Sequence, residues 1–247
     1  STDGTDSFLK RAKKEISNLS YFRQKKKGPA TARNLGIKNS TGDIIFFTDD
    51  DCIVPKNWIE KFVHMYQKHP EIVGVGGYLE ADEYTLKTNI FAKYESYMAR
   101  TAYRTDRGEY IGGFECPALG TSNISYKKSV LEEVGGFDEI FSVAVGEDTD
   151  LKLNICLRNG KLAYIPLKTT HIQDYKLGRF IRQNVARGIS DVYFLKKWRK
   201  VLNNKIKKKQ YSAVTIFLKM LKELKFSMLF LFLLSVIARR WGKWKQN

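Results

Sequence analysis

Three consecutive carboxylates, Asp49-Asp50-Asp51, follow a short apolar run at residues 44–47. The length of that run, the glycine before it and its Ile and Phe content favour a buried β-strand over a helix. In an open parallel sheet, ligands bind just beyond the carboxyl ends of the strands, where these acids would lie. Carboxylates two residues apart on a turn, such as Asp49 and Asp51, can present oxygens to a hard divalent cation that also holds substrate phosphates. An acidic triplet alone is more often a solvated turn, so whether this one binds a cation depends on the rest of the sequence.

A second acidic group, Glu147-Asp148, stands where a loop meets a predicted helix. Asp148 could simply cap that helix, since Asp is a favoured capping residue. It could also act as a general base, which requires a carboxylate in a desolvated pocket that raises its affinity for protons. Both interpretations are compatible with the sequence.

Several elements must position these acids. Pro29 suits the first position of a helix that carries Arg33. Residues 55–68 predict an amphipathic helix, whose core-facing stripe is Ile59, Phe62, Val63 and Tyr66. Short strands are predicted at residues 73–77 and 161–166, and a helix that ends on Gly135-Gly136 is predicted between them.

The net charge of the protein is confined to its last third. The 247 residues carry 43 Lys/Arg and 26 Asp/Glu, a formal net charge of +17. Residues 176–247 hold 19 of the basic residues and two acids, so their net charge is +17, whereas residues 1–175 hold 24 of each sign and are neutral. A neutral body with a basic, apolar tail favours an anionic membrane over nucleic acid as a partner. Three cysteines without metal-type spacing argue against a disulfide framework.

The tail itself contains a basic run at residues 196–209 and an apolar run at 226–238, which Arg239, Arg240 and two tryptophans follow. The apolar run is shorter than the ~20 residues that span a bilayer. The pattern predicts interfacial or re-entrant membrane helices and not a clean transmembrane span. A solvated basic helix and a buried core helix are the alternatives.

Five short motifs, in order, resemble the family-two nucleotide-sugar glycosyltransferases, which have the GT-A fold. They are Gly28-Pro29-Ala30-Thr31-Ala32-Arg33-Asn34-Leu35-Gly36, Thr41-Gly42-Asp43 with the acidic triplet, Gly120-Thr121-Ser122-Asn123, Gly135-Gly136-Phe137-Asp138 and Gly146-Glu147-Asp148. Each motif is weak alone, whereas five in order are specific. Residues 1–5 resemble a turn that follows the family's second strand, so the resemblance implies that the first strands and a base-binding acid are missing from this sequence.

The resemblance also implies roles for individual residues. The implied donor-binding residues are Arg33, Asp49, Asp50, Asp51, Gly120, Ser122 and Asn123. The implied metal ligands for Mg²⁺ or Mn²⁺ are Asp51, Asp49 and His171, although a lone histidine could equally be structural. Asp148 would be the catalytic base, with Glu147 beside it on the acceptor side. Arg33 would either contact the nucleotide diphosphate or form an ion pair with Asp49 or Asp50.

We therefore expect an α/β GT-A domain over residues 1–190, Rossmann-like, with a mostly parallel sheet and flanking helices. Residues 191–247 are expected to form basic, apolar, membrane-associated helices. The expected function is inverting transfer of a sugar from a nucleotide-sugar donor, with a UDP-sugar preferred, to a saccharide or lipid-linked acceptor. The expected location is the cytoplasmic face of the membrane, without nucleic acid as a partner. The alternatives are a non-catalytic membrane- or nucleic-acid-binding protein and an inactive glycosyltransferase fragment.

Overall fold

The computed structural model describes residues 3–25, 28–117, 120–141, 145–205, 213–223 and 225–246. The first two residues of the opening motif and residues 206–209 of the basic run lie outside this part. In chain order the elements are α1 (Thr5–Glu15), α2 (Pro29–Asn39), β1 (Ile44–Phe47), β2 (Cys52–Ile53), α3 (Trp58–Lys68), β3 (Ile72–Glu80), α4 (Glu83–Thr88), α5 (Ile90–Ala102), β4 (Tyr110–Gly112), β5 (Ile124–Lys127), α6 (Lys128–Val134), α7 (Glu147–Leu157), β6 (Lys161–His171), α8 (Leu177–Lys205), α9 (Ala213–Lys222) and α10 (Phe226–Trp244).

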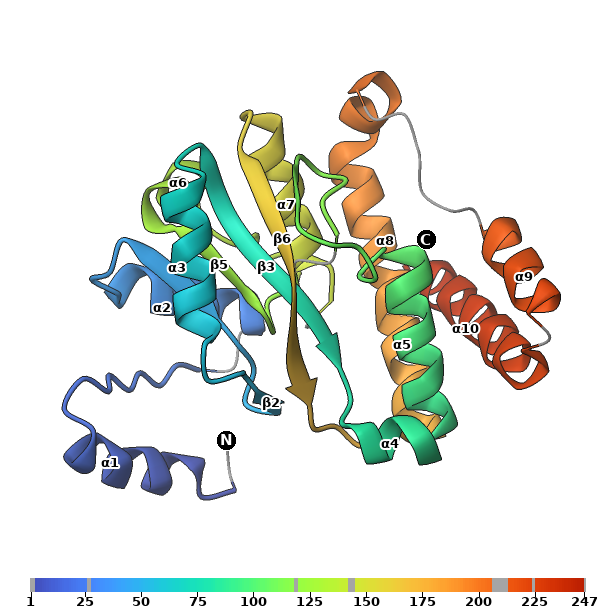
Figure 1. The fold of residues 1–247 in the computed structure, drawn as a ribbon, viewed down its shortest axis with the longest axis horizontal. Coiled ribbons are helices and arrows are strands. Elements are labelled where there is room, and N and C mark those ends of the chain that lie inside the picture. Colours follow the sequence, from blue (N-terminus) through green and yellow to red (C-terminus); the bar gives the residue numbers. More distant parts are fainter. Residues whose placement is uncertain are drawn as a thin grey trace.

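A central sheet with helices around it confirms the α/β class (Figure 1). The strand order is β1-β5-β3-β6-β2, with β4 paired to β6. The expectation of a mostly parallel sheet was wrong, because β3–β6 is the one parallel pairing among the described strands. Strand β5 enters the sheet at the end where β1 finishes and runs back between β1 and β3, so both of its pairings are antiparallel.

Alternating residues of β6 contribute to the two hydrophobic cores of the sheet. Leu162 and Tyr164 pack with α2, α6 and α7, whereas Ala163, Ile165 and Leu167 pack with α3 and β3. This period of two is the signature of a strand buried on both faces. The predicted strand at residues 161–166 is therefore longer than expected and extends to His171.

The helix boundaries follow from local sequence signals, with one error. Pro29 is the first residue of α2, and Gly135 ends α6 in the left-handed region at φ 81°, both as predicted. Helix α3 begins at Trp58, three residues later than Pro55, and Ile59 of the predicted stripe is 59% exposed. Trp58 takes a place in the core instead, because its indole donates a hydrogen bond to buried Asn123.

The C-terminal helices form a third core with α5. Phe180 of α8, Ile216 and Met220 of α9, and Phe232 of α10 pack around Tyr94 of α5. Part of the tail is therefore a folded helical layer, as the alternative of a buried core helix anticipated. Within the described residues, no helix is both long enough and apolar enough to cross a membrane. The division at residues 190 and 191 falls inside α8 and stays a prediction.

Candidate active site

The acidic triplet lies on a tight turn between β1 and β2. The turn is closed by a hydrogen bond from the Cys52 amide to the Asp49 carbonyl at 3.2 Å. Asp49 accepts a 2.5 Å hydrogen bond at Oδ2 from Ser122 Oγ, and Thr48 Oγ1 donates to the Ser122 carbonyl at 3.2 Å. Because β5 starts at this end of the sheet, the loop before it lies against the acidic turn. The structure thus brings Ser122 to the triplet, and its contact with a donor stays a prediction.

Arg33 connects the acidic turn to the second acidic group. Its Nη2 lies 3.1 Å from Asp49 Oδ1, and its Nη1 lies 2.7 Å from Glu147 Oε1. The guanidinium also lies over the ring of Phe137, 5.7 Å from its centroid, and the side chain is only 16% exposed. Of the two expectations for Arg33, the ion pair to Asp49 is present, and its second pair to Glu147 was not foreseen.

Glu147 is buried at the first position of α7. Its side chain is 3% exposed, and Oε2 has no hydrogen-bond partner within the described residues. Burial and the neighbouring charge of Asp148 raise the pKa of Glu147 to about 7, against the opposing effect of Arg33. The Glu147 carboxyl group, with one arginine partner and one unpartnered oxygen, is therefore partly protonated near neutral pH.

Asp148 lies beside the loop that carries Ser122. Helix α7 begins at Glu147 with Gly146 as its N-cap, so Asp148 lies within the first turn and is not the N-cap residue. Asp148 Oδ1 accepts a 2.6 Å hydrogen bond from the Thr149 amide. The Oδ2 atom lies 3.4 Å from the position that a Cβ on Gly120 would occupy. Burial raises the pKa of Asp148, which is the environment that a general base requires.

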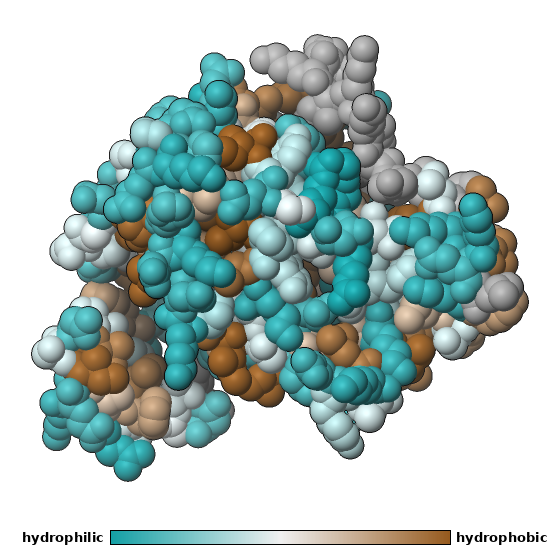
Figure 2. Space-filling view, viewed as in Figure 1, coloured by the Kyte–Doolittle hydropathy of each residue, from teal (hydrophilic) through white to brown (hydrophobic). Residues whose placement is uncertain are grey.

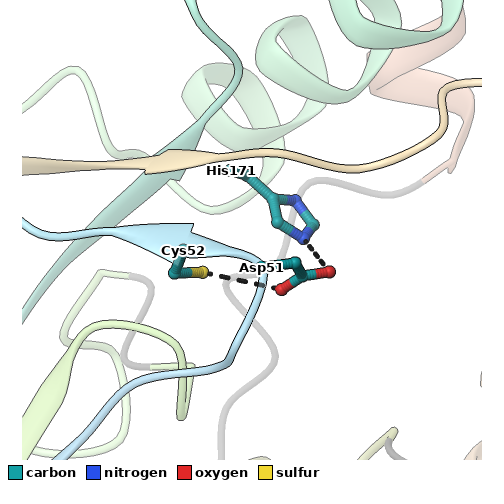
Figure 3. A group of neighbouring side chains, drawn as sticks. All are labelled: Asp51, Cys52 and His171. Atoms are coloured by element: carbon teal, nitrogen blue, oxygen red, sulfur yellow. Dashed lines mark hydrogen bonds and ion pairs between the residues drawn. The ribbon is translucent and has the colours of Figure 1, made fainter. Parts of the chain in front are cut away.

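Asp51 and His171 meet where β2 pairs with the end of β6. Cys52 is opposite His171 in the register, and the Ile172 amide donates to the Asp51 carbonyl at 2.7 Å. His171 Nε2 consequently lies 3.2 Å from Asp51 Oδ2, and the Cys52 thiol points toward the other oxygen at 3.8 Å (Figure 3). The structure therefore brings Asp51 and His171 together, and their binding of a metal ion stays a prediction.

This cluster offers ligands of two kinds. Single ligand atoms of Asp51, Cys52 and His171 lie within 4.8 Å of one another. Burial raises the pKa of the Cys52 thiol to about 11, so the group stays protonated at neutral pH, and a thiol is a poor partner for hard cations. The carboxylate and the imidazole therefore fit a divalent cation, whereas the protonated, half-buried Cys52 thiol fits a packing role.

The remaining predicted donor-binding residues have different surroundings. Asp50 is exposed on the turn, and Gly120 lies beside Asp148. Asn123 is 2% exposed, and its amide donates to the carbonyls of Tyr78 and Leu167 at 3.0 and 2.8 Å. Its side-chain carbonyl is occupied by the indole of Trp58. The expected contact of Asn123 with the donor is thus replaced by a structural role, because its polar atoms are used within the sheet.

Two features of the site come from α8 and were not predicted. Arg179 Nη2 lies 3.5 Å from Asp51 Oδ2, beside His171. Asp150 is buried and accepts hydrogen bonds from Lys197 at 2.8 Å and Trp198 at 2.6 Å. Arg179 is the third residue of α8, and only the position of this helix brings it to the turn.

A model of the glycosyl transferase family 2 matches residues 1–135, which is more than half of the chain. The chain belongs to this family, as the motifs predicted. Curated relatives include the glucosyl-dolichyl phosphate glucuronosyltransferase of Haloferax volcanii, 29% identical over 55% of this chain and 44% of the relative. The pre-mycofactocin glycosyltransferase of Mycobacterium tuberculosis is also 29% identical, over 57% of this chain and 29% of the relative. The chain thus spans less than half the length of these relatives.

A solved structure shows the same fold over nearly the whole chain. The mannosyltransferase PcManGT from Pyrobaculum calidifontis, in complex with GDP-Man and Mn²⁺, is similar with a TM-score of 0.58 at 17% identity. The similarity covers 96% of this chain and 62% of the other. The architecture is therefore GT-A-like, with a mixed sheet and flanking helices.

Proposed function

We propose that the chain transfers a sugar from a nucleotide-sugar donor to a hydroxyl group of an acceptor, with inversion at the anomeric carbon. The observation that carries this proposal is the loop at residues 120–123, which touches both acidic groups. Ser122 bonds to Asp49, and Gly120 lies against Asp148. Two residues of chain span at most ~7 Å, so this loop holds the acidic turn and the proposed base within a distance that one bound sugar could bridge.

Asp148 is the proposed catalytic base. Its raised pKa gives the carboxylate a higher affinity for the proton of the acceptor hydroxyl than an exposed aspartate has. The deprotonated oxygen attacks the anomeric carbon on the face opposite to the nucleoside diphosphate. The C–O bond to the diphosphate breaks, the electron pair leaves with the diphosphate, and the product has inverted configuration.

Asp51 and His171 are the proposed direct ligands of a divalent cation, with Asp49 completing the acidic turn. The bound cation would offset the negative charge on the departing diphosphate. An imidazole ligand favours Mn²⁺ over Mg²⁺, which prefers oxygen ligands. Arg179, next to Asp51, adds a permanent positive charge at the same place.

The identity of the substrates is proposed from the resemblance and the relatives. A UDP-sugar is the preferred donor, although the GT-A structure most informative for comparison contains GDP-Man. The name of the Haloferax relative includes a dolichyl phosphate saccharide, which supports a lipid-linked acceptor. The basic tail supports a location at the cytoplasmic membrane face.

The test is release of nucleoside diphosphate from UDP-, GDP- and dTDP-sugars, with Mn²⁺, with Mg²⁺ or with EDTA, in the presence and absence of a polyprenyl-phosphate saccharide. We expect release that requires a cation and is lost in Asp51→Asn. NMR of the product should show the anomeric configuration opposite to that of the donor. A folded protein that binds none of these donors in equilibrium dialysis would contradict the proposal.

A further inference from the structure

Helix α10 presents a continuous stripe of large apolar side chains to solvent. The stripe consists of Phe226, Phe230, Leu233, Ile237, Trp241 and Trp244, whose exposed fractions range from 49% to 74%. Successive residues of an α-helix are rotated by about 100°, so these six fall within a sector of about 80°. We call this set the apolar stripe of α10.

The opposite side of the same helix is already occupied. Leu231, Phe232, Ser235, Ala238 and Gly242 are buried against the neighbouring helices. The core of the protein therefore accounts for one face of α10, and the apolar stripe needs a separate explanation. Figure 2 shows apolar side chains along the right-hand edge of the molecule, where α9 and α10 lie.

Charges flank the stripe on both sides. Arg240 and Lys245 are exposed, and their positions on the helix place them at the two edges of the apolar sector. Arg239 and Lys243 form ion pairs with Asp191, at 3.3 and 3.0 Å. The stripe thus has cations at its margins and two indoles at its C-terminal end, the composition of a membrane interface.

The charge of the tail selects among the occupants that could cover the stripe. Residues 176–247 carry a net charge of +17. Two such tails brought face to face would repel each other, whereas an anionic bilayer would neutralise both. The charge complementarity therefore favours a lipid surface over a second copy of the chain.

We propose that α10 lies flat in the headgroup region of an anionic membrane, with the apolar stripe inserted among the acyl chains. This inference rests on the membrane location proposed above and assigns it to one helix face. The helix lies parallel to the bilayer plane and does not cross it. Its cations contact lipid phosphates or carboxylates at the margins of the stripe.

Helix α8 lies between α10 and the active site and contacts both. Gly188 and Gly242 let α8 and α10 approach closely, since a Cβ on Gly188 would lie 2.1 Å from the Arg239 carbonyl oxygen. On its other side, α8 places Ser190 against Gly146, the residue before Glu147. An inserted α10 would therefore hold the helix that carries Asp148 at a defined height above the lipid.

The test is co-sedimentation of the full chain with vesicles of phosphatidylcholine alone or of equal parts phosphatidylcholine and phosphatidylglycerol, without donor. The variant Phe230→Glu/Ile237→Glu changes two residues of the stripe. The matched control is Ile59→Glu/Tyr84→Glu, which adds the same charge at positions that are 59% and 75% exposed on α3 and α4. Circular dichroism and thermal melting of both double variants test whether each is still folded.

We expect the wild type to bind the anionic vesicles, with a blue shift of tryptophan emission, and to bind phosphatidylcholine alone at least ~10-fold more weakly. The stripe variant should lose at least ~10-fold in affinity for the anionic vesicles, because two inserted side chains become charged, and the control should match the wild type. Equal binding by the stripe variant would overturn the proposal. The proposal would also be overturned if the wild type did not bind vesicles but formed a dimer in sedimentation velocity that was absent in the stripe variant. Donor hydrolysis measured without vesicles tests the proposed enzyme separately.

Discussion

Arg33 and Glu147 are 114 positions apart in the sequence, yet Nη1 of Arg33 lies 2.7 Å from Oε1 of Glu147. The same guanidinium reaches Asp49 through its other nitrogen at 3.1 Å. One arginine on α2 therefore joins the turn that carries the proposed metal ligands to the helix that carries the proposed base. Arg33 therefore links the two acidic groups directly.

Arg33→Met should destabilise the protein by about 1.5–3 kcal/mol at pH ~8, because Glu147 loses its charged hydrogen-bond partner and has to take up a proton to remain buried. Adding Glu147→Gln should recover a substantial part of that loss, since the remaining amide is neutral. Urea denaturation of the wild type, both single variants and the double variant measures the coupling. Strictly additive effects would show that the ion pair is unimportant. Arg11→Met on exposed α1 is the control, expected within about 0.5 kcal/mol of wild type.

The stability of the protein should depend on pH through Glu147. Its pKa is raised from 4.5 to about 7 in the folded state, so the folded protein binds the proton more tightly than the unfolded chain does. The contribution is therefore fully present below pH ~4.5 and is lost as the pH rises through about 7, by roughly 3 kcal/mol at most. In Glu147→Gln this decline should be shallower, and the part that remains comes from Asp148, whose pKa is also raised by burial. Denaturation curves between pH ~4.5 and ~8 that fall in parallel for both proteins would refute the assignment.

Asp148→Asn should lower kcat by roughly 10²–10⁴-fold, the usual effect of removing a general base. The melting temperature and the affinity for the donor should change little, because the amide can still accept the hydrogen bond from the Thr149 amide. The rate of the wild type should rise with pH as the raised pKa of Asp148 is passed, and the variant should lack that rise. Near-wild-type turnover by the variant would remove Asp148 from the mechanism.

The affinity for Mn²⁺ should depend on the side chain of His171 and not on that of Cys52. Loss of the imidazole in His171→Ala removes a proposed ligand and should weaken binding of Mn²⁺ by ~10–100-fold. Cys52→Ala is the matched control, because it removes a soft sulfur atom from the same cluster and should leave the affinity unchanged. Electron paramagnetic resonance of free Mn²⁺ measures both variants without any turnover. A larger effect at Cys52 than at His171 would reverse the assignment of ligands.

Local sequence signals predicted much of the framework. Pro29 and Gly135 marked helix ends because they act through their own backbone geometry. The apolar run before Asp49 became β1, and the motif order identified the family that the family model confirmed. The motifs also selected Asp49, Asp51, Ser122, Asp148 and His171, which the structure gathers around one turn and one loop.

Contacts between distant segments were decided by the tertiary structure. The reversed direction of β5 contradicted the mostly parallel sheet and brought Ser122 to Asp49. The burial of Asn123 under Trp58 took its amide away from the donor side.

The path of α8 produced further contacts that the sequence did not predict. It carries Arg179 to Asp51, and it carries Lys197 and Trp198 to Asp150. Residue type and local spacing thus determined which groups could do chemistry. Which of them face one another depends on strand direction and helix packing, which arise from burial of the whole chain and have no local signature.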